Sequence, residues 1–209
     1  GQVSVLGLDP RRDKATLHRQ IGYLPGELAF PGRERASDLL RFLGEARGGV
    51  GWSQVTDLAD RLELDLSRPV RTMSKGNKQK VGLVQAFMHR PALLVLDEPT
   101  SGLDPLMQHE FLAMVREARA DGRTIFMSSH VLAEVQQVAD RVAIVRDGRL
   151  AAVERVESLG RRAVRSVEIH FGDPVEVADF AGLAGVSDVV VSGPILRCTV
   201  DGRLDPLIK

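Results

Sequence analysis

The sequence is poor in cysteine and in aromatic residues, and it has no excess of charge of either sign. Cys198 is the only cysteine among 209 residues, which excludes an internal disulfide and a cysteine-based zinc site and suits a reducing compartment. Lysine and arginine (28) balance aspartate and glutamate (28), so no global field favours nucleic acid or an acidic membrane surface as a partner. No apolar run approaches the roughly 18 residues that a membrane-spanning helix needs.

The rest of the composition is that of a globular protein. Hydrophobic residues make up 44% and charged residues 27%, which is enough to bury a core, and the length fits one domain with a smaller appendage. The central stretch is residues 92–104, Ala-Leu-Leu-Val-Leu-Asp-Glu-Pro-Thr-Ser-Gly-Leu-Asp. Its aliphatic run, residues 93–96, shows no polar alternation, which is typical of a strand that a parallel sheet buries on both faces.

Two adjacent carboxylates, Asp97 and Glu98, end this strand. Ligands of open α/β sheets bind beyond the carboxyl ends of the strands, so both side chains are candidates to face a ligand. In nucleotide hydrolases such an aspartate holds Mg²⁺, and a neighbouring glutamate can orient or deprotonate the attacking water. The alternative is a buried strand that ends in two solvated acids.

A second candidate ligand site begins at residues 73–80, Met-Ser-Lys-Gly-Asn-Lys-Gln-Lys. Ser74 is a natural N-cap, and apolar residues then recur at helical spacing up to Met88. A positively charged helix N-terminus that carries Gly76 is suited to bind an anion. An ordinary cap followed by an amphipathic helix explains the same residues.

His130 follows a third apolar segment, Thr124–Met127, which we expect to be another buried strand. A lone histidine is usually structural, but one at a strand's carboxyl end lies beside the same crevice as Asp97 and Glu98.

The remaining pattern predicts further elements. They are a strand at 3–8, a strand at 21–24, two amphipathic helices within 37–66 that break at 48–51, a helix from 105 to 120, a helix at 132–139, and a hairpin that turns at Asp147-Gly148. Trp52 is expected to pack under the loop at the helix break. Beyond residue 165 the pattern predicts strands at 167–171, 189–191 and 195–200, a helix at 175–183, and a helix that begins at Asp205-Pro206.

Together these segments resemble the nucleotide-binding domain of an ATP-binding-cassette (ABC) transporter, over roughly residues 1–153. The resemblance lies in the order of the motifs: the approach to the Q-loop at 23–25, the helical subdomain at 37–66, the signature motif at 74–79, Walker B at 93–98, the D-loop at 101–104 and the switch histidine at 128–130. The residues of these motifs are most similar to those of the subfamily that energises multidrug, antibiotic-resistance and other ABC-2-type exporters.

The resemblance implies an α/β fold: a P-loop NTPase-like ATPase core with a parallel sheet and a helical subdomain, followed by a partial α+β accessory domain. The implied boundaries are 1–157 for the core, with 34–68 as its helical subdomain, 158–165 for a linker, and 166–209 for the accessory domain.

Three departures from the family pattern affect what we expect. Lys75 replaces the first glycine of the signature, and Gly26 stands where the family has glutamine, so Glu27 is the candidate substitute as a Mg²⁺ or water contact. No G-x-x-x-x-G-K-[ST] motif and no adenine-stacking aromatic residue occur. Both would lie upstream of Gly1, so we expect a sequence truncated at its N-terminus, and at its C-terminus too, and residues 1–209 to be inactive alone.

The resemblance also implies roles and partners. Asp97 would help hold Mg²⁺, Glu98 would be the catalytic base, and His130 would sense the γ-phosphate of ATP. The nucleotide contacts would come from Ser74, Lys75, Gly76, Asn77, Gln79, Asp104 and Glu27. Two copies would pair head to tail, as a homodimer or with a homologous subunit, and would drive a membrane permease from the cytoplasmic face, with no nucleic acid partner. A soluble non-transport ABC-type ATPase and a non-catalytic scaffold are the alternatives.

Overall fold

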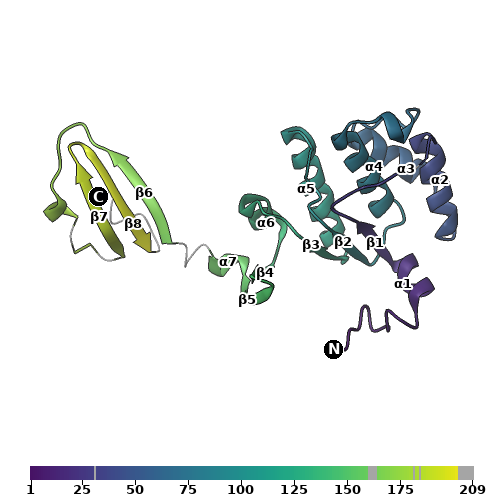
Figure 1. Cartoon of the computed structure of the whole chain (residues 1–209), viewed down its shortest axis with the longest axis horizontal. Helices are drawn as coiled ribbons and strands as arrows, with labels where there is room; N and C mark the ends of the chain where they lie inside the picture. Colours follow the sequence, from purple (N-terminus) through teal and green to yellow (C-terminus); the bar gives the residue numbers. More distant parts are fainter. Residues whose placement is uncertain (31, 160–163, 181, 184, 202–209) are drawn as a thin grey trace. The chain divides into compact units, whose positions relative to one another are not determined.

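The computed structural model describes residues 1–30, 32–159, 164–180, 182–183 and 185–201. The chain divides into two compact units, Gly1–Val138 and Ala139–Lys209 (Figure 1). The first unit carries strands β1–β3 and helices α1–α6, and the second carries strands β4–β8. None of the helices in the described part of the chain is long and apolar enough to cross a membrane.

A parallel sheet in the order β1-β2-β3 organises the first unit. Its strands are β1 (Ile21–Leu24), β2 (Leu93–Leu96) and β3 (Thr124–Met127). They are in register, since Leu24 pairs with Leu96 and Leu96 with Met127. The carboxyl ends of all three strands therefore lie at one edge of the sheet, which confirms the predicted parallel α/β arrangement.

Helices connect these strands, and their termini follow the sequence signals. The helices of the unit are α1 (Lys14–Gln20), α2 (Ala36–Ala46), α3 (Trp52–Arg61), α4 (Lys75–Phe87), α5 (Pro105–Ala120) and α6 (Leu132–Val138), with a 3₁₀ turn η1 (Val70–Thr72) before α4. Ser74 caps α4, because its Oγ accepts a hydrogen bond from the backbone N–H of Asn77. Asp104 caps α5 in the same way, through the N–H of Met107.

The two faces of the sheet differ in burial. Leu24, Leu94 and Leu96 are at most 1% exposed and pack in the core with residues of α4 and α5. On the opposite face Tyr23 is 52% and Phe126 68% exposed, because no described element covers them. In β2, Leu93 and Val95 are only half-buried, so the predicted burial of residues 93–96 on both faces is complete on one face and partial on the other. The prediction that β3 is a buried strand is wrong, because each of its residues is exposed or half-buried.

Two local predictions near the helices have different outcomes. Trp52 packs against the core as expected, and the guanidinium of Arg41 lies 3.8 Å from its ring centroid. The predicted strand at 3–8 is wrong, since Val5 and Leu8 form only an isolated bridge. The chain reverses between them at Leu6-Gly7, where both residues have positive φ.

The second unit begins with the predicted hairpin of β4 (Arg141–Arg146) and β5 (Arg149–Arg155). Asp147 and Gly148 have φ of 51° and 71°, as a two-residue type I′ turn requires. The structure groups this hairpin with the C-terminal unit, whereas the sequence analysis placed it with the ATPase core. The boundary at residue 157 remains a prediction. Helix α7 (Val156–Leu159) occupies the start of the expected linker, whose residues 160–163 lie outside the described ones.

An antiparallel sheet in the order β6-β8-β7 forms the rest of this unit. The strands are β6 (Val164–His170), β7 (Val186–Ser192) and β8 (Ile195–Asp201), close to the predicted positions. The predicted helix at 175–183 is wrong, because the described residues of this range form only a 3₁₀ turn, η2 (Val177–Asp179). Reciprocal bonds between Glu176 and Asp179 close this turn, and Gly182 then adopts a φ of 108° that ends any helix. The predicted helix at Asp205-Pro206 lies outside the described residues.

Candidate active site

The candidate site lies where the three parallel strands end. The backbone N–H of Asp97 donates to the carbonyl of Leu24, and the N–H of Ser128 donates to the carbonyl of Leu96, both at 2.9 Å. The sheet ladder thus continues one residue beyond each strand. It holds the first residues after β2 and β3 side by side.

Ser128 fixes the carboxylate of Asp97. Its Oγ donates to Oδ1 of Asp97 at 2.6 Å, and the same Oγ accepts from the backbone N–H of Glu98 at 2.9 Å. Gly26 leaves room beside the other carboxylate oxygen, since a Cβ on Gly26 would lie 2.9 Å from Oδ2 of Asp97. A residue with a side chain there would crowd the carboxylate, whereas glycine keeps the space beside it open for a ligand.

Glu98 and His130 form a direct pair. Nδ1 of His130 lies 2.8 Å from Oε2 of Glu98, and the His130 side chain is 80% exposed while that of Glu98 is 33% exposed. The structure therefore brings together the two residues that the sequence analysis named as catalytic. A carboxylate oriented by an imidazole next to open solvent can accept a proton from a bound water.

The backbone of Glu98 is held in a strained conformation. Its φ is 46°, in the left-handed region, which costs roughly 1–3 kcal/mol for a residue with a side chain. Hydrogen bonds on both sides hold it there: Ser128 Oγ accepts from its N–H, and its carbonyl accepts from the N–H of Ser101 and from the side chain of Gln79.

The remaining predicted site residues lie on three segments: the start of α4, the turn at residues 101–104 and the segment after β1. Ser74 and Lys75 are exposed at the start of α4, and Gly76 touches the turn at residues 101–104 so closely that a Cβ on it would lie 2.4 Å from the carbonyl of Gly102. The carboxylate of Asp104 caps α5 on the other side of this turn, and Asn77 is half-buried. Gln79 is buried, and Glu27 is exposed after β1.

A buried carboxylate that the sequence analysis missed joins two of these loops. Glu134 on α6 is 7% exposed, and its Oε2 accepts hydrogen bonds from Thr100 Oγ1 at 3.0 Å and from Ser129 Oγ at 3.2 Å. It ties the segment after Glu98 to the segment before His130. Its position in the first turn of α6 could be seen in the sequence. Acidic residues are common there because they interact favourably with the helix dipole, so the position alone did not indicate a link between two loops.

The donor set fits Mg²⁺ that arrives with a nucleotide. Among the described residues no group of three or more His, Cys, Asp or Glu side chains is placed to hold a metal by itself. Mg²⁺ commonly binds through one or two carboxylates together with substrate phosphates, and the open side of Asp97 offers such a carboxylate.

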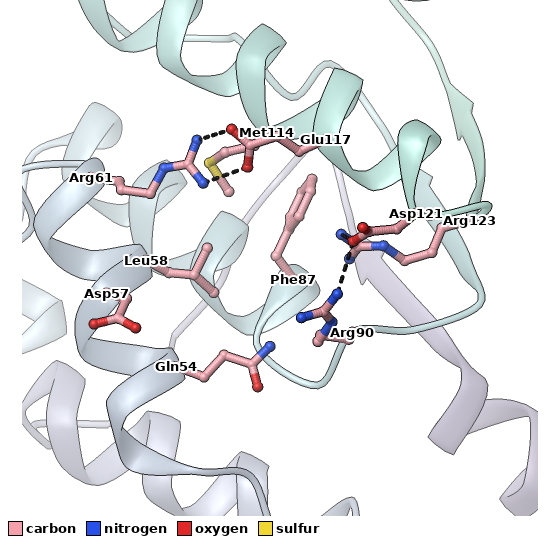
Figure 2. A pocket seen from close by; sticks show the side chains of 10 residues that line it. All are labelled: Gln54, Asp57, Leu58, Arg61, Phe87, Arg90, Met114, Glu117, Asp121 and Arg123. Atoms are coloured by element: carbon pink, nitrogen blue, oxygen red, sulfur yellow. Dashed lines mark hydrogen bonds and ion pairs between the residues drawn. The ribbon is translucent and has the colours of Figure 1, made fainter.

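A cavity of about 370 Å³ lies elsewhere, between α3, α4 and α5 (Figure 2). None of the predicted site residues lines it. Five of its charged residues form ion pairs with one another, Arg61 with Glu117 at 2.7 Å, and Arg90 and Arg123 with Asp121 at 3.0 Å. The hydrogen bonds from Arg61 hold the pKa of Glu117 below its ordinary value. We interpret this cavity as part of the contact between helices α3 and α5.

The chain is similar to known proteins over most of its length. The family model described as ABC transporter matches residues 1–101. The bacitracin transport ATP-binding protein BcrA of Enterococcus faecalis is 31% identical over 83% of this chain and 57% of its own length. The Nod factor export ATP-binding protein I of Rhizobium etli is 30% identical over 96% of this chain and 65% of its own length. The chain thus spans less than two thirds of these relatives.

A solved structure is similar to this chain in both sequence and fold. An ATP-binding subunit of an ABC transporter superposes with a TM-score of 0.70 and 31% identity, over 77% of this chain and 69% of the solved one.

Proposed function

The chain belongs to the family of ABC transporter ATP-binding domains, and we propose that it is the part of an ATPase subunit that powers export through a separate membrane permease. The observation that carries this proposal is the Glu98–His130 pair beside the Asp97 carboxylate at the ends of β2 and β3. The relative whose name refers to bacitracin transport supports a role in transport, and the relative whose name refers to Nod factor export supports the export direction.

We assign the chemistry to the residues as follows. Glu98 accepts a proton from the water that attacks the γ-phosphorus of ATP, while the bond from this phosphorus to the β–γ bridging oxygen breaks and ADP leaves. His130 orients the Glu98 carboxylate and reaches the γ-phosphate. Asp97, held by Ser128, would bind Mg²⁺. The ion would neutralise charge that develops on the phosphoryl oxygens.

A second copy would complete the site. We propose a head-to-tail dimer in which Ser74, Lys75, Gly76 and Asn77 of one copy close on the nucleotide held by the other. A helix N-terminus with Lys75 beside it attracts phosphate, so this end of α4 suits that role. Asp104 would support the contact through the turn at 101–104, and Glu27 would contact the ion or water. The subunit would act at the inner face of the cell membrane, bound to its permease.

The test is the variant Glu98→Gln in the complete gene product that contains this chain. We expect it to bind Mg-ATP, to hydrolyse it at least about 100-fold more slowly, and to accumulate as a dimer with ATP bound. The control is Glu45→Gln, which changes an exposed carboxylate on α2. Turnover near the wild-type rate in Glu98→Gln would overturn the assignment of Glu98 as the base.

Residues 1–209 contain no G-x-x-x-x-G-K-[ST] segment, whose backbone N–H groups cradle phosphates in this class. We therefore expect the chain alone to show no ATPase activity and an ATP affinity no tighter than ~1 mM, or about 4 kcal/mol of binding. Isothermal titration with Mg-ATP, beside the complete gene product, measures this. Micromolar binding by the chain alone would mean that another of its segments provides the phosphate site.

A further inference from the structure

Gln79 connects helix α4 to the loop that carries Glu98. Its Nε2 donates to the carbonyl of Glu98 at 3.2 Å and to the carbonyl of Pro99 at 2.9 Å. The residue is only 3% exposed. The family resemblance implies that Gln79 contacts the nucleotide, but a side chain that is buried and bonded to two backbone carbonyls is occupied with the protein itself.

The loop needs such a contact because of its backbone. Glu98 has a positive φ, which a residue with a side chain keeps only when its surroundings hold it. Ser128, after β3, holds the N–H of Glu98, and Gln79, on α4, holds its carbonyl. The first contact fixes Glu98 relative to the sheet, and the second fixes it relative to the helix.

We propose that Gln79 is a positioning residue that sets the direction of the Glu98 carboxylate according to the position of helix α4. Gln79 lies one helical turn after Gly76, so it moves with the end of α4 that closes on the nucleotide of the second copy. A displacement of that end is transmitted through one side chain to the catalytic base of the same copy. This inference rests on the proposed function, in which Glu98 is the base and α4 acts in trans.

The first test measures the position of Glu98 without ATP. His130 contacts the Glu98 carboxylate, so the NMR signals of the His130 ring report where that carboxylate lies. In the 209-residue chain, Gln79→Met keeps the size of the side chain and removes its donor. We expect the His130 ring signals of this variant to shift toward their positions in Glu98→Gln, which lacks the ionised partner.

The matched control is Gln85→Met. Gln85 lies on the same helix and donates the same kind of bond, from Nε2 to the carbonyl of Tyr23, but it does not contact the Glu98 loop. We expect the His130 signals to stay unchanged in this variant. If thermal unfolding shows that Gln79→Met is not folded at the temperature of the NMR experiment, Gln79→Glu takes its place, because its ionised side chain also lacks the donor. Unchanged His130 signals in a folded Gln79 variant would overturn the inference.

The second test separates positioning from nucleotide binding. In the complete gene product we expect Gln79→Met to lower kcat by about 10- to 100-fold with the KM for Mg-ATP retained, as for a misplaced catalytic group. A rise in KM with unchanged kcat would mean that Gln79 contacts the nucleotide, and would overturn the inference. If Glu98→Gln retained its turnover, the proposed function would fail, whereas the NMR comparison would still decide whether Gln79 positions residue 98.

Discussion

Nδ1 of His130 lies 2.8 Å from Oε2 of Glu98, although 32 positions separate these residues in the chain. The pairing follows from the sheet, because β2 and β3 are parallel neighbours in register and each residue follows the end of its strand. His130 is mostly exposed, so its imidazole can turn toward a phosphate without losing a packed environment.

The first prediction is that His130→Ala lowers ATP turnover of the complete gene product by about 100-fold while Mg-ATP still binds. The reason is that the Glu98 carboxylate loses the group that orients it, whereas the phosphate contacts remain. Steady-state hydrolysis and equilibrium binding measure the two effects. The control is His109→Ala, which changes an exposed histidine whose Nδ1 bonds to the carbonyl of Pro105 within α5 and to no other of the described residues. Equal activities of the two variants would contradict the role of His130.

The second prediction concerns the contact between β1 and α4. A Cβ on Gly22 would lie 2.1 Å from the carbonyl oxygen of Ala86 and 2.7 Å from Cδ2 of Leu94. Since the first of these atoms is backbone and cannot turn away, Gly22→Ala must separate the strand from the helix. We expect the free energy of unfolding to fall by about 2–4 kcal/mol, measured by denaturant titration.

The matched control is Gly172→Ala, where a Cβ meets nothing within 4 Å and φ is not positive. We expect its effect to stay within about 0.5 kcal/mol. Similar unfolding midpoints of the two variants would mean that β1 and α4 are less closely packed than the structure has them.

The third prediction is a pH dependence that comes from His89. Burial, together with the positive charge of Arg47, lowers the pKa of His89 to about 4. Its Nε2 bonds to the carbonyl of Ile21 at 3.1 Å, and its Nδ1 is buried without a hydrogen-bond partner among the described residues. A second proton would therefore place an unpaired charge inside the protein.

The sign follows from the two pKa values. In the unfolded state His89 takes up a proton below pH ~6.5, whereas in the folded state it stays neutral down to about pH 4. The contribution of neutral His89 to the free energy of unfolding is therefore complete above pH ~6.5 and is lost as the pH falls toward 4. We expect a loss of about 1 kcal/mol between pH 7 and pH 5, after allowance for partial exposure. His89→Gln should remove this part of the pH dependence of the thermal midpoint. If the thermal midpoints of the wild-type protein and of His89→Gln changed with pH by the same amount, the role of His89 would be contradicted.

Local sequence signals predicted much of the fold. Ser74 and Asp104 mark the starts of α4 and α5, and Asp147-Gly148 marks the hairpin turn, because each effect depends on one or two adjacent residues. The predictions of burial that failed depend on contacts between residues far apart in the sequence. The exposure of Tyr23 and Phe126 depends on which elements cover the sheet, and the sequence pattern of a strand does not carry that information.

The candidate site was predictable only in part. The positions of Asp97, Glu98 and His130 after apolar strands indicated a shared edge, and the structure brings these residues together. The positive φ of Glu98 and the burial of Gln79 were not predictable, because both depend on how α4 packs against the loop after β2. The role of Glu134, which joins two loops across the edge, was not visible either, because it depends on how α6 packs against the loops after β2 and β3.

The most direct test of the central claim is complementation between two inactive variants of the complete gene product. Ser74→Arg would block the proposed signature end of α4, and Glu98→Gln would remove the proposed base. In a head-to-tail dimer that contains one copy of each, one of the two sites combines an intact Glu98 with an intact Ser74. The control mixture pairs Ser74→Arg with the double variant Ser74→Arg/Glu98→Gln, which offers no complete site.

We expect each single variant to be nearly inactive, the mixture of the two to regain part of the ATP hydrolysis, above either one, and the control mixture to stay inactive. This outcome requires both that Glu98 is the base and that α4 acts on the nucleotide of the other copy. A mixture of Ser74→Arg and Glu98→Gln that hydrolyses ATP no faster than the separate variants would contradict the account.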